Sequence, residues 1–241
     1  EAADPAERLY TYPFGPYPML GGVSSTTGSS LVWAHETFCQ GQGLSFEECV
    51  GRAVEVEPGA AGLSFVPYLA GERSPYWSDK IRAGFHGLQL THKPDHMVRA
   101  VMEGVAYSLR HLLDIYAELG VPIDEIALAG GGASTPGWPQ IIADVCQRDV
   151  LIYAEKETVT RVLYALCQAH LGRRRFETAL LQTFDEPVII RHCRELARPY
   201  KDAYRRYRAL AGFASEQAGA GQQQTLTCAT HSALTNGGKE R

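Results

Sequence analysis

Three consecutive glycines, Gly130–Gly132, interrupt an apolar run and precede Thr135 and Pro136. A capping hydroxyl followed by proline predicts that a helix starts at this pair, and the apolar residues 126–129 predict a strand before the glycines. Bare backbone between a strand and a helix suits phosphate, because unpaired N–H groups and the helix dipole attract anions. We therefore predict a nucleotide site here; a tight strand–helix turn without a ligand is the alternative.

The spacing of these glycines excludes two common phosphate-binding motifs. The stretch "AGGGASTPGW" contains neither GxxxxGK[ST] nor GxGxxG, so it is neither a P-loop nor a Rossmann fingerprint. Any nucleotide bound at this point would be held by another type of fold.

Histidine and cysteine, which often hold metals, give no metal site in this sequence. His92 and His96 are four residues apart, but Pro94 between them argues against a shared helix. No cysteines form a CxxC pair, and a disulfide framework would be unusual for a chain of this size. We expect free thiols in a reducing cytoplasm. The cysteines concerned are Cys39, Cys49, Cys146, Cys167, Cys193 and Cys228.

Two acidic residues are further candidates. Glu72 and Arg73 lie in a loop flanked by aromatic residues, where they could face a cleft or shape the loop. Glu103 directly precedes Gly104 within a predicted helix, and we expect it to make a structural hydrogen bond rather than to act in catalysis. No residue is assigned a catalytic role.

The elements that must position these residues alternate between strand and helix. Apolar residues in steps of three and four over 98–119 predict the longest helix, with Asp95 as its cap. A second strand is predicted over 149–155, followed by a helix over 157–171 that Gly172 closes. Strand–helix–strand–helix order predicts a layered α/β domain.

The bulk composition is that of a globular domain with a core. The chain has 241 residues, 45% of them apolar and 21% charged, and a net charge of −4. This charge attracts neither nucleic acid nor an anionic membrane, and no run approaches the ~18 apolar residues of a membrane span. The start, "EAADPAERLY", is unlike a secretory signal and lacks an initiator methionine, which favours a segment of a longer protein.

The C-terminal part changes in composition. A last helix is predicted over 198–210, with Tyr200, Tyr204 and Tyr207 at helical spacing. We take 1–212 as one compact unit and predict that 213–241, rich in Ala, Gly, Gln, Thr and Ser, is a flexible low-complexity tail.

Several motifs together resemble one family. "AGFHGLQLTHKPDHMVRAVMEG" (Ala83–Gly104) is similar to the second signature of the FGGY carbohydrate kinases. "GERSPYW" upstream and "GGGASTPGWPQIIADV" downstream resemble loops of that family in the same order. The tyrosines of the last helix resemble those of its xylulokinase-like members, and the chain as a whole is similar to xylulokinase-like or gluconokinase-like members. The resemblance covers about residues 15–210.

The resemblance implies an actin-like ATPase (ribonuclease H-like) α/β fold, of which this chain would be most of the C-terminal lobe. In such kinases ATP, with Mg²⁺, phosphorylates a hydroxyl of a small sugar or polyol in a cleft between two lobes. The N-terminal lobe, the first strands and the catalytic aspartate would lie outside this chain, so we expect it to be inactive alone. A homodimer is left open. The nucleotide-contacting residues that the resemblance implies are Gly28, Val32, Gly130, Gly131, Gly132, Ala133, Ser134 and Thr135.

One departure from the family pattern leaves a second hypothesis open. Where the family has a Gly-Ala-Ala stretch, this chain has Val162-Leu163-Tyr164, which is too bulky for equally close helix packing. The chain could therefore be a truncated or degenerate kinase domain that serves as a non-catalytic binding or interaction module. For the enzyme, xylulose or a related pentulose is the favoured substrate, with gluconate, ribulose and glycerol as alternatives.

Overall fold

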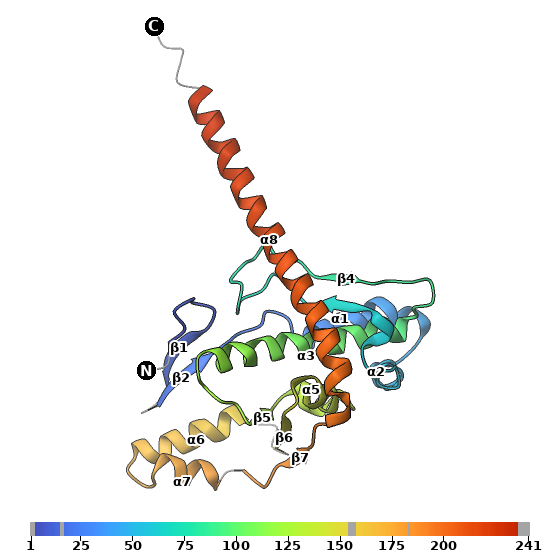
Figure 1. Cartoon of the computed structure of the whole chain (residues 1–241). Coiled ribbons are helices and arrows are strands. Elements are labelled where there is room, and N and C mark those ends of the chain that lie inside the picture. Colours follow the sequence, from blue (N-terminus) through green and yellow to red (C-terminus); the bar gives the residue numbers. More distant parts are fainter. Residues whose placement is uncertain (1–2, 15–16, 154–157, 183, 236–241) are drawn as a thin grey trace.

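The computed structural model describes residues 3–14, 17–153, 158–182 and 184–235 (Figure 1). Three predicted segments lie partly outside these residues: the strand over 149–155, the helix over 157–171 and the tail over 213–241. For Cys228 only the backbone is described. The elements in chain order are β1 (Tyr10–Phe14), β2 (Tyr17–Gly21), α1 (Gly28–Phe38), α2 (Phe46–Val54), β3 (Ser64–Val66), β4 (Gly84–His86), α3 (Pro94–Glu118), β5 (Glu125–Leu128), α4 (Gly131–Ser134), α5 (Trp138–Cys146), β6 (Asp149–Ile152), α6 (Thr158–His170), α7 (Phe176–Leu181), β7 (Val188–Ile190) and α8 (Ala197–Thr235).

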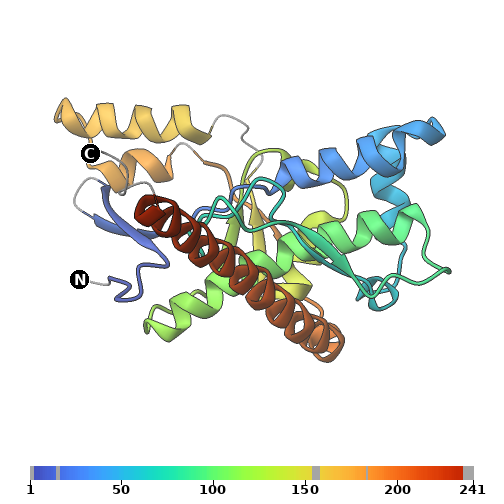
Figure 2. The ribbon, with the colours of Figure 1, turned by 90° about the horizontal axis from the view of Figure 1, so that it is seen from above.

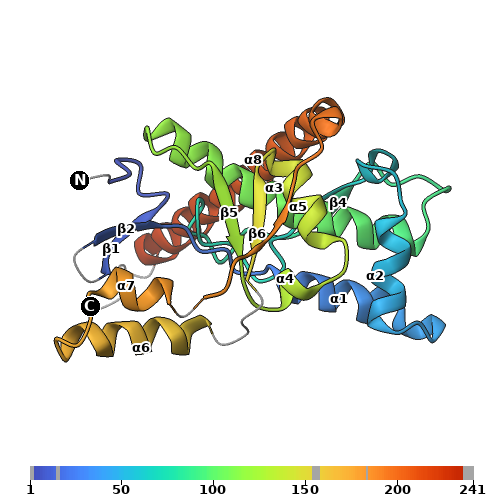
Figure 3. The same cartoon turned by 90° about the horizontal axis from the view of Figure 1, so that it is seen from below.

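A three-stranded sheet carries the strand–helix–strand order predicted from the sequence. Its order is β5–β6–β7, with β5 parallel to β6 and β7 antiparallel to β6. Helix α5 connects the two parallel strands and packs against β6 and β7, and in Figure 3 the sheet lies in front of α3 and α8. The α/β class is confirmed. Two antiparallel pairs, β1–β2 and β3–β4, lie outside this sheet.

Helix α3 is the centre of the hydrophobic core. It packs against α1, α2, α5 and β3. In the stripe predicted from the sequence, Val98, Val101 and Val105 are buried, and Leu109, Tyr116 and Leu119 are partly buried. The cap prediction was wrong: the helix begins at Pro94 with Lys93 as N-cap, and Asp95 lies in the first turn. Proline fits the first helical position because its missing N–H would have no intrahelical partner there. Asp95 still favours the helix through the positive end of its dipole.

A buried charged cluster on α3 ties the core to α8. Glu103 accepts hydrogen bonds from Arg99 Nε (2.7 Å), the Gly59 amide (2.9 Å) and the Tyr107 hydroxyl (3.1 Å). Arg99 also donates to the Tyr200 hydroxyl at 3.0 Å. Burial raises the pKa of Glu103, and the Arg99 guanidinium opposes that rise. Glu103 therefore has the structural role that the sequence predicted.

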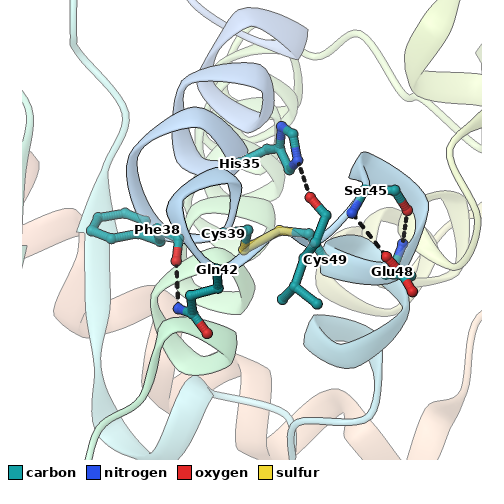
Figure 4. Close-up of a disulfide and its surroundings, with 8 residues drawn as sticks. His35, Phe38, Cys39, Gln42, Ser45, Glu48 and Cys49 are labelled. Carbon is teal, nitrogen blue, oxygen red and sulfur yellow. Dashed lines mark hydrogen bonds between the residues drawn. A yellow bond between two sulfur atoms is a disulfide. The ribbon is translucent and has the colours of Figure 1, made fainter.

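A disulfide joins α1 to α2, which corrects the expectation of free thiols at these two positions. Cys39 caps the end of α1 and pairs with Cys49 of α2; their Cα atoms are 6.1 Å apart (Figure 4). The short turn between the helices ends at Ser45, whose Oγ accepts a hydrogen bond from the Glu48 amide. This capping box starts α2 beside the end of α1, and so brings two cysteines ten residues apart within bonding reach.

The last helix, α8, crosses over α3 and then leaves the rest of the molecule (Figures 1 and 2). Tyr200, Tyr204 and Tyr207 are buried where it crosses. The boundary expected at 212 falls within this helix, because α8 continues to Thr235 and Ala214 and Ala218 pack against the core. The flexibility of the segment beyond stays a prediction.

Helices α6 and α7 pack on one another at the opposite side of the sheet from α2 (Figure 3). We call residues 158–190, with α6, α7 and β7, the arm. None of the helices in the described part of the chain has the length and apolarity needed to cross a membrane.

Candidate functional site

The glycine run lies at the carboxyl end of β5, as the sequence predicted, but its local structure differs. Gly130 has a φ of +75°, and Gly131 begins the short helix α4. Thr135 is extended, and its hydroxyl donates to the Gly131 carbonyl at 2.9 Å. Thr135 therefore closes the glycine turn instead of capping a helix.

The next helix, α5, begins at Trp138, two residues later than predicted. Its N-cap is Gly137, with a φ of +72°. A Cβ at this position would lie 2.6 Å from a methyl carbon of Val54, so only glycine lets the chain turn against α2 here. The capping prediction at Thr135 failed because this packing contact, which the local sequence does not reveal, sets the start of α5.

The second predicted contact region forms the start of α1. Gly28 is the first residue of this helix, and its N-cap, Thr27, makes no side-chain capping bond. No acidic residue lies in the first turn of α1, so nothing there competes with an anionic ligand for the positive end of the dipole. Val32 lies one turn later and is 47% exposed.

One cavity brings the two glycine regions together. It has a volume of about 310 Å³, and its lining includes Gly28 and Gly132 with the apolar side chains of Leu109 and Trp138. The hydroxyl residues Ser24, Thr27 and Ser108 also line it. The other predicted contact residues do not line it: Val32, Gly130, Gly131, Ala133, Ser134 and Thr135. The sequence analysis missed the three hydroxyl residues; the run "SSTT" before Gly28 was the signal for two of them.

The space above these glycines is open. A Cβ placed on Gly28 or Gly131 would meet no atom within 4 Å, and one on Gly132 would approach Trp138 only at 3.9 Å. At Gly104, by contrast, a Cβ would collide with the Phe65 carbonyl. Internal packing thus requires glycine at 104 but not at 28, 131 or 132. At these three positions the missing side chains leave space that a ligand could occupy.

A larger apolar cavity lies against the other side of the β5 end. It has a volume of about 570 Å³ and shares Leu128 and Ala129 with the first cavity. Tyr153 and Phe184 line it in an edge-to-face contact at 5.5 Å, and Val162 of α6 contributes to its wall. The departure from the family pattern therefore reaches this cavity through Val162, while Leu163 and Tyr164 are exposed.

Glu72 holds the loop that leads to Gly28. Its carboxylate is buried and accepts hydrogen bonds from the Ser25 amide (2.7 Å), the Arg73 amide (2.8 Å) and the Ser24 hydroxyl (2.9 Å). Burial raises its pKa, and the three donors counteract that rise. Of the two alternatives, the structure supports loop shaping for Glu72, while Arg73 is exposed beside a polar cavity.

Among the described residues, no group of three or more His, Cys, Asp or Glu side chains could hold a metal ion. The rings of His92 and His96 are 5.4 Å apart. His96 lies in the first turn of α3 and His92 outside it, because Pro94 starts the helix.

Comparison with known proteins places this arrangement in a family. The chain matches the description "FGGY family of carbohydrate kinases, C-terminal domain" over residues 1–161. A xylulose kinase of Lactococcus lactis subsp. lactis is 39% identical over 143 residues, which is 59% of this chain and 28% of that protein. A gluconokinase of Bacillus subtilis is 34% identical over 143 residues, 56% of this chain and 28% of that protein.

Solved structures of sugar kinases share the fold. Xylulose kinase from Lactobacillus acidophilus superposes with a TM-score of 0.80 at 23% identity, over 90% of this chain and 44% of that one. Xylulose kinase from Rhodospirillum rubrum gives a TM-score of 0.76 at 27% identity, over 89% of this chain and 43% of that one. The chain thus spans less than half the length of these relatives. It belongs to the FGGY family of carbohydrate kinases and corresponds to their C-terminal domain.

Proposed function

We propose that this chain supplies the nucleotide-binding wall of an ATP-dependent carbohydrate kinase. The observation that carries the proposal is the cavity that Gly28 and Gly132 line together, with open space where their side chains would stand. Glycine without an internal packing role fits close approach of a ligand to the backbone. The first turn of α1 adds N–H groups and a dipole end that favour phosphate.

The residues present fit ATP with Mg²⁺. ATP supplies the phosphoryl group, and Mg²⁺ neutralises its charge. Mg²⁺ bound to a nucleotide is held mainly by phosphates and water and needs no dedicated cluster of protein ligands. Apolar side chains such as Leu109 and Trp138 would exclude water from the cavity and strengthen electrostatic contacts inside it.

The acceptor is a sugar or polyol hydroxyl, and a pentulose such as xylulose is favoured because several relatives are named xylulose kinase. A relative named gluconokinase keeps gluconate as an alternative, and ribulose and glycerol remain further alternatives. The general base and the facing lobe would come from residues outside this chain. The proposed kinase would act in the cytoplasm. The chain alone should therefore show no sugar-dependent release of ADP.

Nucleotide binding to the purified chain tests the proposal. We expect weak, Mg²⁺-dependent binding of ATP by titration calorimetry or ligand-observed NMR. Gly132→Val and Gly28→Val should weaken it at least about tenfold without changing the melting temperature, because both positions line the cavity and have room for a side chain. Gly51→Val is the control, since Gly51 of α2 is equally open but lies outside the cavity. Site variants that bind ATP like the unmodified chain would refute the assignment.

A second candidate function is a non-catalytic interaction module, and the arm favours it. Large apolar side chains are exposed there, among them Leu163, Tyr164 and Leu181, and exposed apolar patches mark interaction surfaces. A chain that binds no nucleotide, and whose concentration-dependent self-association is lost in Leu163→Ser, would support this function over the kinase.

A further inference from the structure

A polar cavity of about 490 Å³ lies beside the cavity of the glycines, and Ser24 lines both. Its lining includes Ser25, Glu72, Arg73, Trp77 and Asp79. The function proposed above assigns nothing to it. Its position next to the candidate nucleotide cavity makes its chemistry relevant to the same site.

The charges around this cavity disfavour a polyanion. The lining includes two acidic residues, Glu72 and Asp79, and one basic residue, Arg73. A nucleotide or a free phosphate would meet a net negative lining, whereas hydroxyl groups can donate to carboxylates and accept from a guanidinium and from serine hydroxyls. The lining therefore suits a neutral molecule with many hydroxyl groups.

Trp77 gives the cavity an aromatic wall in an unusual conformation. Its side chain is 50% exposed, and its backbone has a φ of +48°. Left-handed backbone at a bulky residue costs about 1–3 kcal/mol and persists where the surroundings enforce it, often at functional sites. Tyr10 contacts the indole edge to face, with ring centroids 6.4 Å apart, and the rest of the ring is open to solvent.

The loop around Trp77 is built to hold the indole in place. Glu72 and Ser78 exchange two backbone hydrogen bonds of 2.9 and 2.8 Å, and the Trp77 amide donates to the Arg73 carbonyl. The Trp77 indole N–H donates to the Arg8 carbonyl at 3.2 Å. The ring is thereby fixed at one edge while half of it stays open to solvent, as a stacking platform requires.

We propose that this cavity binds a neutral polyol, with Trp77 stacking on its C–H face and Arg73, Asp79 and Ser25 bonding its hydroxyls. The inference rests on the proposed function, since it gives the acceptor class of that kinase a place on this chain. Glu72 is a positioning residue: its three hydrogen bonds orient Ser24, Ser25 and the Arg73 backbone.

Saturation-transfer NMR of the purified chain with xylitol, without nucleotide, tests this inference. We expect saturable binding in the millimolar range, as for a small polar ligand with few anchoring groups. Arg73→Gln and Trp77→Gly should each weaken it at least about fivefold. Both variants should fold, because Arg73 is exposed and glycine accepts a positive φ. Lys80→Gln and Asp124→Asn, at exposed positions outside this cavity, are the controls.

The outcomes separate this inference from the kinase proposal. Loss of xylitol binding in Arg73→Gln and Trp77→Gly, with the controls unchanged, supports the site whether or not the chain binds ATP. Three results would overturn it: no saturable binding, equal binding in every variant, or displacement of xylitol by inorganic phosphate. Each would do so even if the glycine variants lose ATP binding as expected. Binding of xylitol without binding of ATP would instead refute the kinase proposal alone.

Discussion

The body of the domain, built around α3, and the arm use their apolar side chains in opposite ways. In the body, tyrosines, valines and Trp138 are buried against one another. In the described residues of the arm the fully buried side chains are the small Ala165 and Ala179, while Leu163, Tyr164 and Leu181 are exposed. The match to the family ends at residue 161, near the start of α6. The body thus buries its apolar side chains, including the tyrosines of α8 beyond the match, whereas the arm presents an apolar surface.

Polar groups follow the same division. The body holds a buried ion pair, Arg99 with Glu103, in which both side chains are at most 5% exposed. The ion pair of Arg175 with Glu177 in the arm is exposed on both sides. Exposed pairs contribute little because water and salt screen them, whereas removing one partner of a buried pair strands a charge. Substitutions should therefore have large effects in the body and small ones in the arm.

The largest expected effect is at the buried ion pair. Glu103→Ala leaves the Arg99 guanidinium buried without its carboxylate and should lower the free energy of unfolding by about 3–5 kcal/mol. Urea unfolding followed by circular dichroism measures this change. Glu118→Ala, at the exposed end of the same helix, is the matched control and should cost less than about 1 kcal/mol. Equal losses in the two variants would contradict the division between buried and exposed charge.

Next in size is the disulfide, which fixes one end of the body. Replacing Cys39 and Cys49 together by alanine should lower the free energy of unfolding by roughly 2–3 kcal/mol, because the bond closes a short loop and restricts the unfolded chain. Cys167→Ser is the control, since Cys167 is a free, exposed cysteine of the arm. Labelling of the unreduced chain with a thiol reagent checks the bond. Modification of Cys39 and Cys49 would contradict the prediction, because disulfide-bonded cysteines do not react.

A pH dependence of the body is expected from His111. Burial, with the nearby Arg208 and Arg8 charges, lowers the pKa of His111 to about 4, and no described residue forms a hydrogen bond with its Nδ1. The ordinary pKa of histidine, which applies to the unfolded chain, is about 6.5. Between pH 6.5 and pH 4 the unfolded chain therefore binds a proton that the folded chain does not, and the free energy of unfolding falls as the pH drops below about 6.5. Between pH 7 and pH 5 the loss should be about 2 kcal/mol.

Substitution isolates this contribution. His111→Gln should flatten the pH dependence of the unfolding free energy over this window, whereas His86→Gln, on exposed β4, should leave it unchanged. A slope that persists in His111→Gln would mean that another group carries it.

The features of the body that the sequence predicted are those with a local cause. The stripe from Val98 to Val105 follows helical periodicity, and the glycines follow a strand because apolar residues precede them. The start of α5 could not be predicted, since it depends on the contact between Gly137 and Val54, more than eighty residues apart. The Cys39–Cys49 bond was missed because the expectation rested on chain size and spacing, while the pairing depends on how α1 and α2 fold back on one another.

The sequence predicted glycines of the candidate site but not the other residues that line its cavities. Gly28 and Gly132 stand out in the sequence because consecutive or turn-forming glycines break apolar runs. Ser108, which lines the same cavity, lies within a long helix and carries no local signal. The exposure of Trp77 arises from a loop closed by Glu72 and Ser78, which the local sequence does not reveal. Such walls assemble from distant segments, so only the fold reveals them.

The smallest expected effect is in the arm, and it tests the comparison most directly. Leu163 and Tyr164 are 55% and 52% exposed, so the double substitution Leu163→Ser, Tyr164→Ser removes little buried area. The free energy of unfolding should change by no more than about 0.5 kcal/mol at each position, as for other surface substitutions. Solubility should rise, because an exposed apolar patch is reduced. Urea unfolding measures the first quantity and light scattering at high concentration the second. A loss above about 2 kcal/mol would mean that these side chains pack against the body in solution, and the distinction between a self-supporting body and an exposed arm would then fail.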